Sequence, residues 1–316
     1  MLSVDFGIAR NVSTRVHKVC GIVGIYYKNK KLQGSLGASL AAMLVQMSER
    51  GPDSAGVAVY RDPVGAGQLK VSLFSASEYD WESLKSELES QSGQDIEYAR
   101  HATHALFTVP NNGFDAVAWI LATHPELRLM SAGSSIEIYK EKGLPQEFVR
   151  QFDLQQFSGS HALGHTRMAT ESAVTTEHSH PFSTGLDLCL VHNGSLSNHN
   201  RLRQSLRNCG VDIRTDNDSE VAAGYLMWRL REGDTLEQAL ERALLDLDGF
   251  YTLAIGTKNG FAVLRDPIAC KPAIMAETDD WVAMASEFRA IAQLEGVEHA
   301  NVWEPAPATV YAWGGQ

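Results

Sequence analysis

The stretch Cys20-Gly21-Ile22-Val23-Gly24-Ile25-Tyr26-Tyr27 is apolar at almost every position. Such a continuous pattern predicts a short strand that is covered on both faces. One thiol stands at its head, and the glycine that follows lets other backbone or a ligand approach closely. A cysteine in this position is most often inert packing. The alternative is a nucleophile, and the rest of the chain decides between the two.

Residues 1–19 differ in character from the strand that follows, since they include Asp5, Arg10, Arg15 and Lys18. They lack the apolar centre of a secretory signal peptide. We therefore expect a propeptide or leader, or a start codon set too far upstream, in preference to a disordered tail. In the first two cases the mature protein begins at Cys20.

Composition excludes several classes of protein. The formal net charge of −11 over 316 residues argues against nucleic acid or an anionic membrane surface as the main partner. No apolar run approaches the length of a transmembrane helix. The cysteines form no C-x-x-C pair, so neither a zinc site nor a redox dithiol is expected, and their small number fits a reducing, cytoplasmic setting.

The first half of the chain contains one clear pattern and one obscure one. Apolar residues recur at helical spacing over 36–47, and 55–60 reads as a strand. Residues 62–156 are harder to interpret, with a weak strand pattern at 69–74, helical patterns at 81–88 and 117–122, and a short strand at 136–139. We expect an insertion here, without a strong core pattern of its own.

The second half is more regular. A buried strand over 186–191 runs into His192-Asn193-Gly194, a strong turn signal. Helices are expected from about 197 to Gly210, from Asp218 to 231, and after Asp234, which has Glu237 at capping-box spacing. Strands at 250–257 and 261–265 flank a hairpin. Strands at both ends with helices between them predict a single α+β domain of stacked sheets covered by helices.

A chain that begins at Cys20 would carry a nucleophile and a base on one residue. A free α-amino group titrates near ~7.7–8.0 and a thiol near ~8.5. An amine of that basicity suits a general base at neutral pH, so no histidine partner is required.

Five blocks in unbroken order resemble the class II glutamine amidotransferases, which are N-terminal nucleophile hydrolases. The blocks begin at Cys20, Arg50, Gly164, His192 and Asp218, and they read CGIVG, RGPDSAG, GHTRMAT, HNG and DSE. The chain is most similar to the glutaminase domain of glutamate synthase and to stand-alone subunits such as that of N-methylglutamate synthase. The resemblance runs from Cys20 to about Glu287 and implies a four-layer αββα sandwich over residues 20–316.

The resemblance assigns the chemistry to three residues. Cys20 attacks the side-chain amide of glutamine, forms a thioester and releases ammonia. The Asn193 side-chain amide and the Gly194 N–H donate to the oxyanion of the tetrahedral intermediates. Taken alone, the Asn193-Gly194 dipeptide is more often a plain hairpin turn.

The resemblance assigns substrate binding to four further residues. Arg167 binds the α-carboxylate, for which a planar bidentate donor suits, and Asp218 pairs with the α-ammonium group. Thr170 and His180 line the same pocket. Taken alone, Asp218 suits a helix N-cap, and His180 suits an exposed loop. Arg50 supports the nucleophile, while Met168 stands where many relatives have tryptophan.

The resemblance also implies partners. Released ammonia passes to an acceptor, and we expect this acceptor on a separate synthase subunit that carries any flavin or iron–sulfur centre. This chain is expected to hold no cofactor and no metal, and the 62–156 insertion is a candidate docking surface. Two alternatives remain: an N-terminal-nucleophile amidase that acts on another amide, and a catalytically silent regulatory subunit with the same fold.

Overall fold

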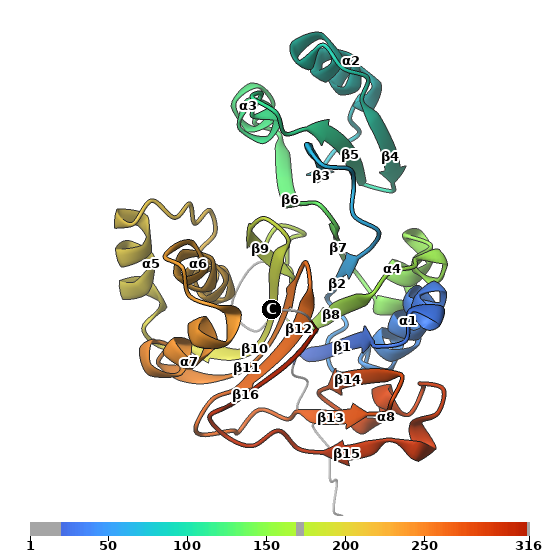
Figure 1. Cartoon of the computed structure of the whole chain (residues 1–316), viewed down its shortest axis with the longest axis vertical. Helices are drawn as coiled ribbons and strands as arrows, with labels where there is room; N and C mark the ends of the chain where they lie inside the picture. Colours follow the sequence, from blue (N-terminus) through green and yellow to red (C-terminus); the bar gives the residue numbers. More distant parts are fainter. Residues whose placement is uncertain (1–19, 169–173, 315–316) are drawn as a thin grey trace, which may run out of the picture.

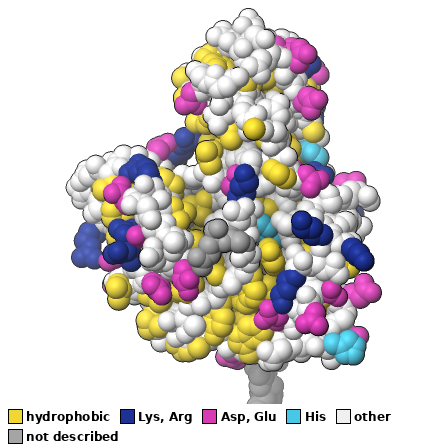
Figure 2. All heavy atoms as spheres, viewed as in Figure 1, with side chains coloured by type: hydrophobic (Ala, Val, Ile, Leu, Met, Phe, Trp, Pro, Cys, Tyr) yellow, Lys and Arg dark blue, Asp and Glu magenta, His cyan; other side chains and the backbone are white. Residues whose placement is uncertain are grey.

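The computed structural model describes residues 20–168 and 174–314 of the chain. Two stacked antiparallel sheets form the centre, and helices cover their outer faces (Figure 1). Among the described residues no helix combines the length and apolar character needed to cross a bilayer. Acidic and basic side chains lie side by side on the face shown in Figure 2.

The first sheet has seven strands in the order β15-β13-β14-β1-β8-β2-β7. The strand expected after Cys20 is confirmed as β1, which pairs with β8 and β14 and is buried along almost its whole length. Helices α1, α4 and α8 pack on the outer face. The strands are β1 (Gly21–Tyr27), β2 (Ser54–Tyr60), β7 (Ile136–Lys142), β8 (His161–Arg167), β13 (Ile274–Glu277), β14 (Trp281–Ala285) and β15 (Asn301–Trp303), and the helices are α1 (Leu36–Gln46), α4 (Pro145–Gln151) and α8 (Phe288–Ile291).

The second sheet has five strands in the order β16-β12-β11-β10-β9. Helices α5, α6 and α7 cover its outer face. Its inner face packs on the first sheet, where Val191 and Val263 join Ile22 and Leu163 in one buried cluster. The strands are β9 (Phe182–Gly185), β10 (Leu188–Leu196), β11 (Gly249–Thr257), β12 (Gly260–Arg265) and β16 (Thr309–Gly314), and the helices are α5 (His199–Asn208), α6 (Asp218–Arg231) and α7 (Leu236–Asp246). The expected αββα sandwich is confirmed.

A third sheet projects from the sandwich as the upper lobe of Figures 1 and 2. We call it the accessory sheet. It consists of β3 (Gln68–Ser75), β4 (Glu97–His101), β5 (His104–Pro110) and β6 (Leu127–Gly133), with α2 (Trp81–Ser92) and α3 (Ala116–Thr123) packed on it. Short 3-10 helices elsewhere are η1 (Lys30–Ser35), η2 (Leu154–Gln156) and η3 (Val297–His299).

The accessory sheet corrects the sequence interpretation of residues 62–156. This segment has a buried core of its own, in which Leu73, Trp81, Leu88 and Phe107 pack together. The sequence pattern is obscure because the strands contribute few buried residues to that core, and β4 contributes none. In addition, β7 lies in the first sheet and α4 packs on its outer face, so the separate sheet spans only residues 68–133.

Several local expectations were also wrong. Asn193 and Gly194 lie inside β10 and pair with β11, so the predicted turn is absent there. Asn217, and not Asp218, caps α6. The capping box of α7 is formed by Thr235 with Gln238. Strand β10 continues because β11 pairs with it as far as Leu196, and each helix cap lies one residue from the expected position.

Candidate active site

Cys20 lies at the entrance of β1, next to the end of β8. Because Gly21 pairs with Thr166 across these antiparallel strands, Cys20 comes level with Arg167. A Cβ atom on Gly21 would lie 2.8 Å from the Thr166 hydroxyl oxygen and 2.9 Å from the Met47 Cβ. The glycine after the thiol is therefore needed for close packing of α1 and β8 against the start of β1.

Asn193 approaches Cys20 from the other sheet. Its side-chain nitrogen donates a hydrogen bond to the Cys20 carbonyl oxygen at 3.2 Å, and the residue is buried. Gly194 follows with a φ of +152°, a conformation that favours glycine. A Cβ atom there would lie 2.0 Å from the Phe250 carbonyl oxygen on β11. The tight pairing of β10 with β11 thus fixes this dipeptide beside the nucleophile.

Arg50 contacts the same carbonyl group. Its Nε donates to the Cys20 oxygen at 3.2 Å, and its Nη1 donates to Glu287 Oε1 at 2.6 Å. The loop that carries Arg50 is pressed against β8, since a Cβ atom on Gly51 would lie 2.4 Å from the Thr166 carbonyl carbon. Arg50 therefore connects the head of β1 with the segment that follows β14.

Arg167 and Asp218 come from different layers of the sandwich. Arg167 ends β8, is buried, and donates from Nη1 to the His178 carbonyl oxygen at 3.2 Å. Asp218 starts α6, where its Oδ2 accepts the Leu196 N–H at 2.9 Å and its Oδ1 accepts the Ser219 hydroxyl at 3.3 Å. Thr170, the remaining expected pocket residue, lies outside the described residues.

The environment of the Cys20 thiol holds opposing influences. Burial raises its pKa, whereas the Met168 backbone N–H and the positive charges of Arg167 and Lys271 act to lower it. The net direction is upward, so the thiol at neutral pH is protonated and needs a base to become a nucleophile. Lys271 could not be predicted from the sequence, because nothing near a lysine in a loop indicates which distant thiol its charge affects.

His180 is not an exposed loop residue. Its ring is buried and stacks on His165 with centroids 4.0 Å apart. Its Nδ1 accepts the His192 backbone N–H at 3.3 Å, and its Nε2 lies 3.2 Å from the Ser219 hydroxyl oxygen. Burial lowers the pKa of His165 to about 3, and it also lowers the pKa of His180 and of His192, so all three rings are neutral at pH 7. No group of histidine, cysteine and carboxylate side chains among the described residues is arranged to hold a metal ion.

Comparison with known proteins identifies the family of this chain. The model of the glutamine amidotransferase domain family matches residues 165–293. The chain is 52% identical over 300 residues to the glutamine amidotransferase-like protein GlxB of Rhizobium meliloti, a match that covers 94% of this chain and 99% of the relative. It belongs to the class II glutamine amidotransferases.

Two further comparisons bear on the family and the fold. A putative glutamine amidotransferase of Methanothermobacter thermautotrophicus is 31% identical over 307 residues, which cover 93% of this chain and 99% of the relative. The solved glutamine phosphoribosylpyrophosphate amidotransferase from B. subtilis, complexed with ADP and GMP, superposes with a TM-score of 0.59 at 22% identity. That superposition covers 93% of this chain, which spans about half (47%) of the B. subtilis chain, and it shows the fold.

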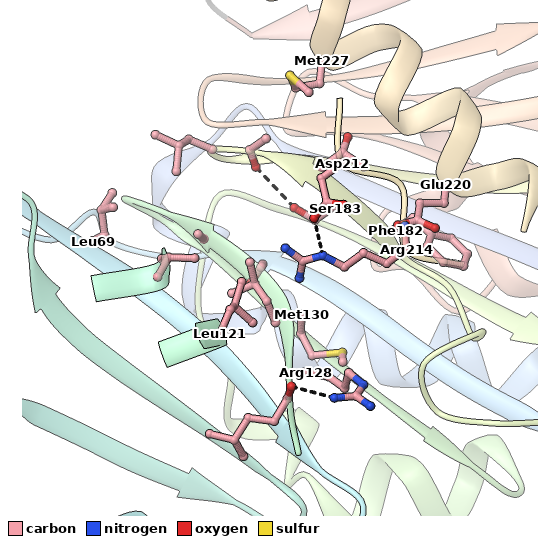
Figure 3. A pocket seen from close by; sticks show the side chains of 18 of the residues that line it. Leu69, Leu121, Arg128, Met130, Phe182, Ser183, Asp212, Arg214, Glu220 and Met227 are labelled. Carbon is pink, nitrogen blue, oxygen red and sulfur yellow. Dashed lines mark hydrogen bonds and ion pairs between the residues drawn. The ribbon is translucent and has the colours of Figure 1, made fainter. Parts of the chain in front are cut away.

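This class II glutamine amidotransferase also has a cavity of about 1160 Å³ away from Cys20. The cavity lies between the accessory sheet, β9 and α6, and Figure 3 shows Leu121 and Met130 on one wall with Met227 on another. The charged side chains of Arg128 and Arg214 enter it as well. None of the candidate catalytic residues lines it, so the cavity and the nucleophile are separate features.

Proposed function

We propose that this protein is a glutaminase that hydrolyses glutamine to glutamate and ammonia through a thioester on Cys20. One observation carries the proposal: at the head of β1 Cys20 comes level with Arg167, whose positive charge acts on its thiol, and its carbonyl oxygen accepts hydrogen bonds from Asn193 and Arg50. A nucleophile, an oxyanion donor and a carboxylate-binding cation therefore meet where the two sheets end.

The first half of the reaction forms the thioester. The α-amino group of an N-terminal Cys20 takes the thiol proton, and the sulfur attacks the side-chain carbonyl carbon of glutamine. An amide nitrogen carries two hydrogens, so the bond from Asn193 to the Cys20 oxygen leaves one hydrogen to donate to the oxyanion, together with the Gly194 N–H. Collapse of the intermediate breaks the C–N bond, and the α-ammonium group returns the proton to the departing ammonia.

The second half hydrolyses the thioester. The α-amino group takes a proton from water, and the resulting hydroxide equivalent attacks the thioester carbonyl carbon. The same two donors stabilise the second oxyanion. Collapse breaks the C–S bond, glutamate leaves, and the thiolate regains its proton from the α-ammonium group. The raised pKa of the Cys20 thiol supports this scheme, because a thiol that is protonated at rest needs such a base.

The two ends of glutamine are recognised by opposite charges. Arg167 binds the α-carboxylate with its planar guanidinium group. Asp218 binds the α-ammonium group, and its carboxylate is held in place by the Leu196 N–H and the Ser219 hydroxyl. The Asp218 side chain is 21% exposed, so lone pairs remain to accept from the ligand.

Ammonia produced at Cys20 passes, in this proposal, to an acceptor site on a separate synthase subunit of the glutamate-synthase or N-methylglutamate-synthase type. Any flavin or iron–sulfur centre belongs to that partner.

The proposal is tested by assaying glutamate and ammonia release from protein whose chain begins at Cys20. We expect hydrolysis by this form and by Cys209→Ala, which removes an exposed thiol at the end of α5. Cys20→Ala should release neither product. Retention of hydrolysis by Cys20→Ala, or no hydrolysis by the parent protein in any partner complex, would refute the proposed function.

A further inference from the structure

One loop, residues 175–181, touches both halves of the proposed glutamine clamp. The His178 carbonyl oxygen accepts from Arg167 Nη1 at 3.2 Å. At the other end, His180 reaches Asp218 through a single hydroxyl group, since Ser219 Oγ lies 3.2 Å from His180 Nε2 and donates to Asp218 Oδ1 at 3.3 Å. The loop therefore contacts the arginine directly and the aspartate through one intermediate.

The protonation of His180 fixes the direction of its bond to Ser219. Its Nδ1 accepts the His192 backbone N–H, so the neutral ring carries its proton on Nε2. That N–H donates to Ser219 Oγ, and the Ser219 hydroxyl lies within hydrogen-bonding distance of two groups, His192 Nδ1 at 2.8 Å and Asp218 Oδ1 at 3.3 Å. Displacement of the loop would disturb this chain and the Arg167 contact together.

Lys140 of β7 binds the backbone of this loop. Its ammonium group donates to the carbonyl oxygens of Ser179 at 2.9 Å, Pro181 at 3.2 Å and Glu177 at 3.3 Å. An ammonium has three N–H bonds, so all of them are directed at this one loop. The side chain is only 4% exposed, and a buried charge is tolerated only with such compensation.

The accessory sheet reaches the same loop by two routes. Arg128 of β6 pairs with Glu177 at 2.9 Å. Thr103, in the turn between β4 and β5, donates to Glu141 Oε2 at 2.8 Å, and Glu141 Oε1 accepts from Thr176 at 2.7 Å. The accessory sheet thus contacts the loop at Glu177 directly and at Thr176 through Glu141, whereas the clamp contacts it at His178 and His180.

We propose that Lys140 is a positioning residue for glutamine, which holds the loop of residues 175–181 so that Arg167 and Asp218 are both aligned for the substrate. This inference rests on the proposed function, because it requires those two residues to bind glutamine. Lys140 touches neither the substrate nor the reacting atoms. The accessory sheet assists through Thr176 and Glu177.

The test compares kcat and KM for glutamine in Lys140→Met and Lys70→Met. Lys70 is a matched control: it is also buried, and its ammonium pairs with Glu137 at 2.7 Å, away from the loop. We expect KM to rise about 10-fold or more in Lys140→Met with kcat within about threefold of the parent value, since uniform binding is lost. Lys70→Met should leave KM unchanged.

Thr176→Val provides a second variant that keeps the shape of the side chain and removes only the bond to Glu141. It should raise KM by about two- to fivefold, and it tests the proposal by itself if Lys140→Met fails to fold. Combination of either variant with Arg167→Lys should raise KM by less than the product of the single effects, because the variants act on one clamp.

The outcomes separate the two proposals. A parent enzyme that does not hydrolyse glutamine refutes the proposed function. An active parent enzyme with equal KM values in Thr176→Val, Lys140→Met and Lys70→Met overturns the positioning role. A fall in kcat without a change in KM overturns it as well.

Discussion

Replacement of Asn193 by alanine tests the oxyanion donor most sharply. Among the described residues the side-chain nitrogen makes one hydrogen bond, to the Cys20 carbonyl oxygen at 3.2 Å, and Asn193 is 3% exposed. Loss of that bond costs about 0.5–1.5 kcal/mol of folding free energy. This corresponds to a fall in Tm of at most about 6 °C in a chain of this size, so the variant remains folded at assay temperature.

Loss of the donor to the oxyanion is expected to cost far more in rate. Removal of one such donor lowers kcat by about 10²–10³-fold. The KM for glutamine should change by less than about threefold, because the donor acts in the transition state and not on bound substrate. The assay is steady-state release of glutamate, with the Tm of each sample measured beside it. A folded Asn193→Ala protein with kcat within threefold of the parent value would refute the oxyanion assignment.

Three further predictions concern packing, substrate binding and pH. Gly21→Ala should lower the free energy of unfolding by about 1–3 kcal/mol in a denaturant titration. Gly34→Ala is the control: nothing lies within 4 Å of the added carbon, so the free energy of unfolding should stay equal or rise. Equal losses in the two variants would contradict the packing argument. Arg167→Lys should raise KM for glutamine by about 10-fold or more, since a point charge cannot replace a bidentate fork, and an unchanged KM would remove Arg167 from the clamp. The free energy of unfolding should be highest above about pH 6.5 and fall as the pH drops toward 4. The cause is that burial lowers the folded-state pKa of His165 to about 3 and of His161 to about 4, while these histidines in the unfolded chain bind protons near ~6.5. A denaturant midpoint that is the same at pH 7 and pH 5 would contradict this.

The central sandwich was accessible from the sequence because its strands and helices are locally consistent. The apolar run after Cys20 became β1, and the hairpin after Thr257 joins β11 to β12 with Thr257 opposite Gly260. In contrast, Asn193-Gly194 has the composition of a turn and yet lies within β10. Pairing with β11 continues through this dipeptide to Leu196, so long-range hydrogen bonds outweigh the local preference.

The candidate site was predictable only in part, and for a physical reason. Cys20, Asn193 and Arg50 meet as expected from the sequence blocks that contain them. The supporting contacts, such as those of Lys140, join a side chain to backbone carbonyl groups of a distant loop. A backbone carbonyl group has the same chemistry in every residue, so no sequence pattern marks it as a partner.

Mass spectrometry after reaction with an electrophilic glutamine analogue would test the central claim most directly. The analogue carries a diazoketone in place of the side-chain amide and alkylates a thiol that attacks at that position. We predict that the reactive chain begins at Cys20 and that a single adduct lies on that residue. Full glutaminase activity in a chain that retains residues 1–19, or an adduct on any other residue, would contradict the account.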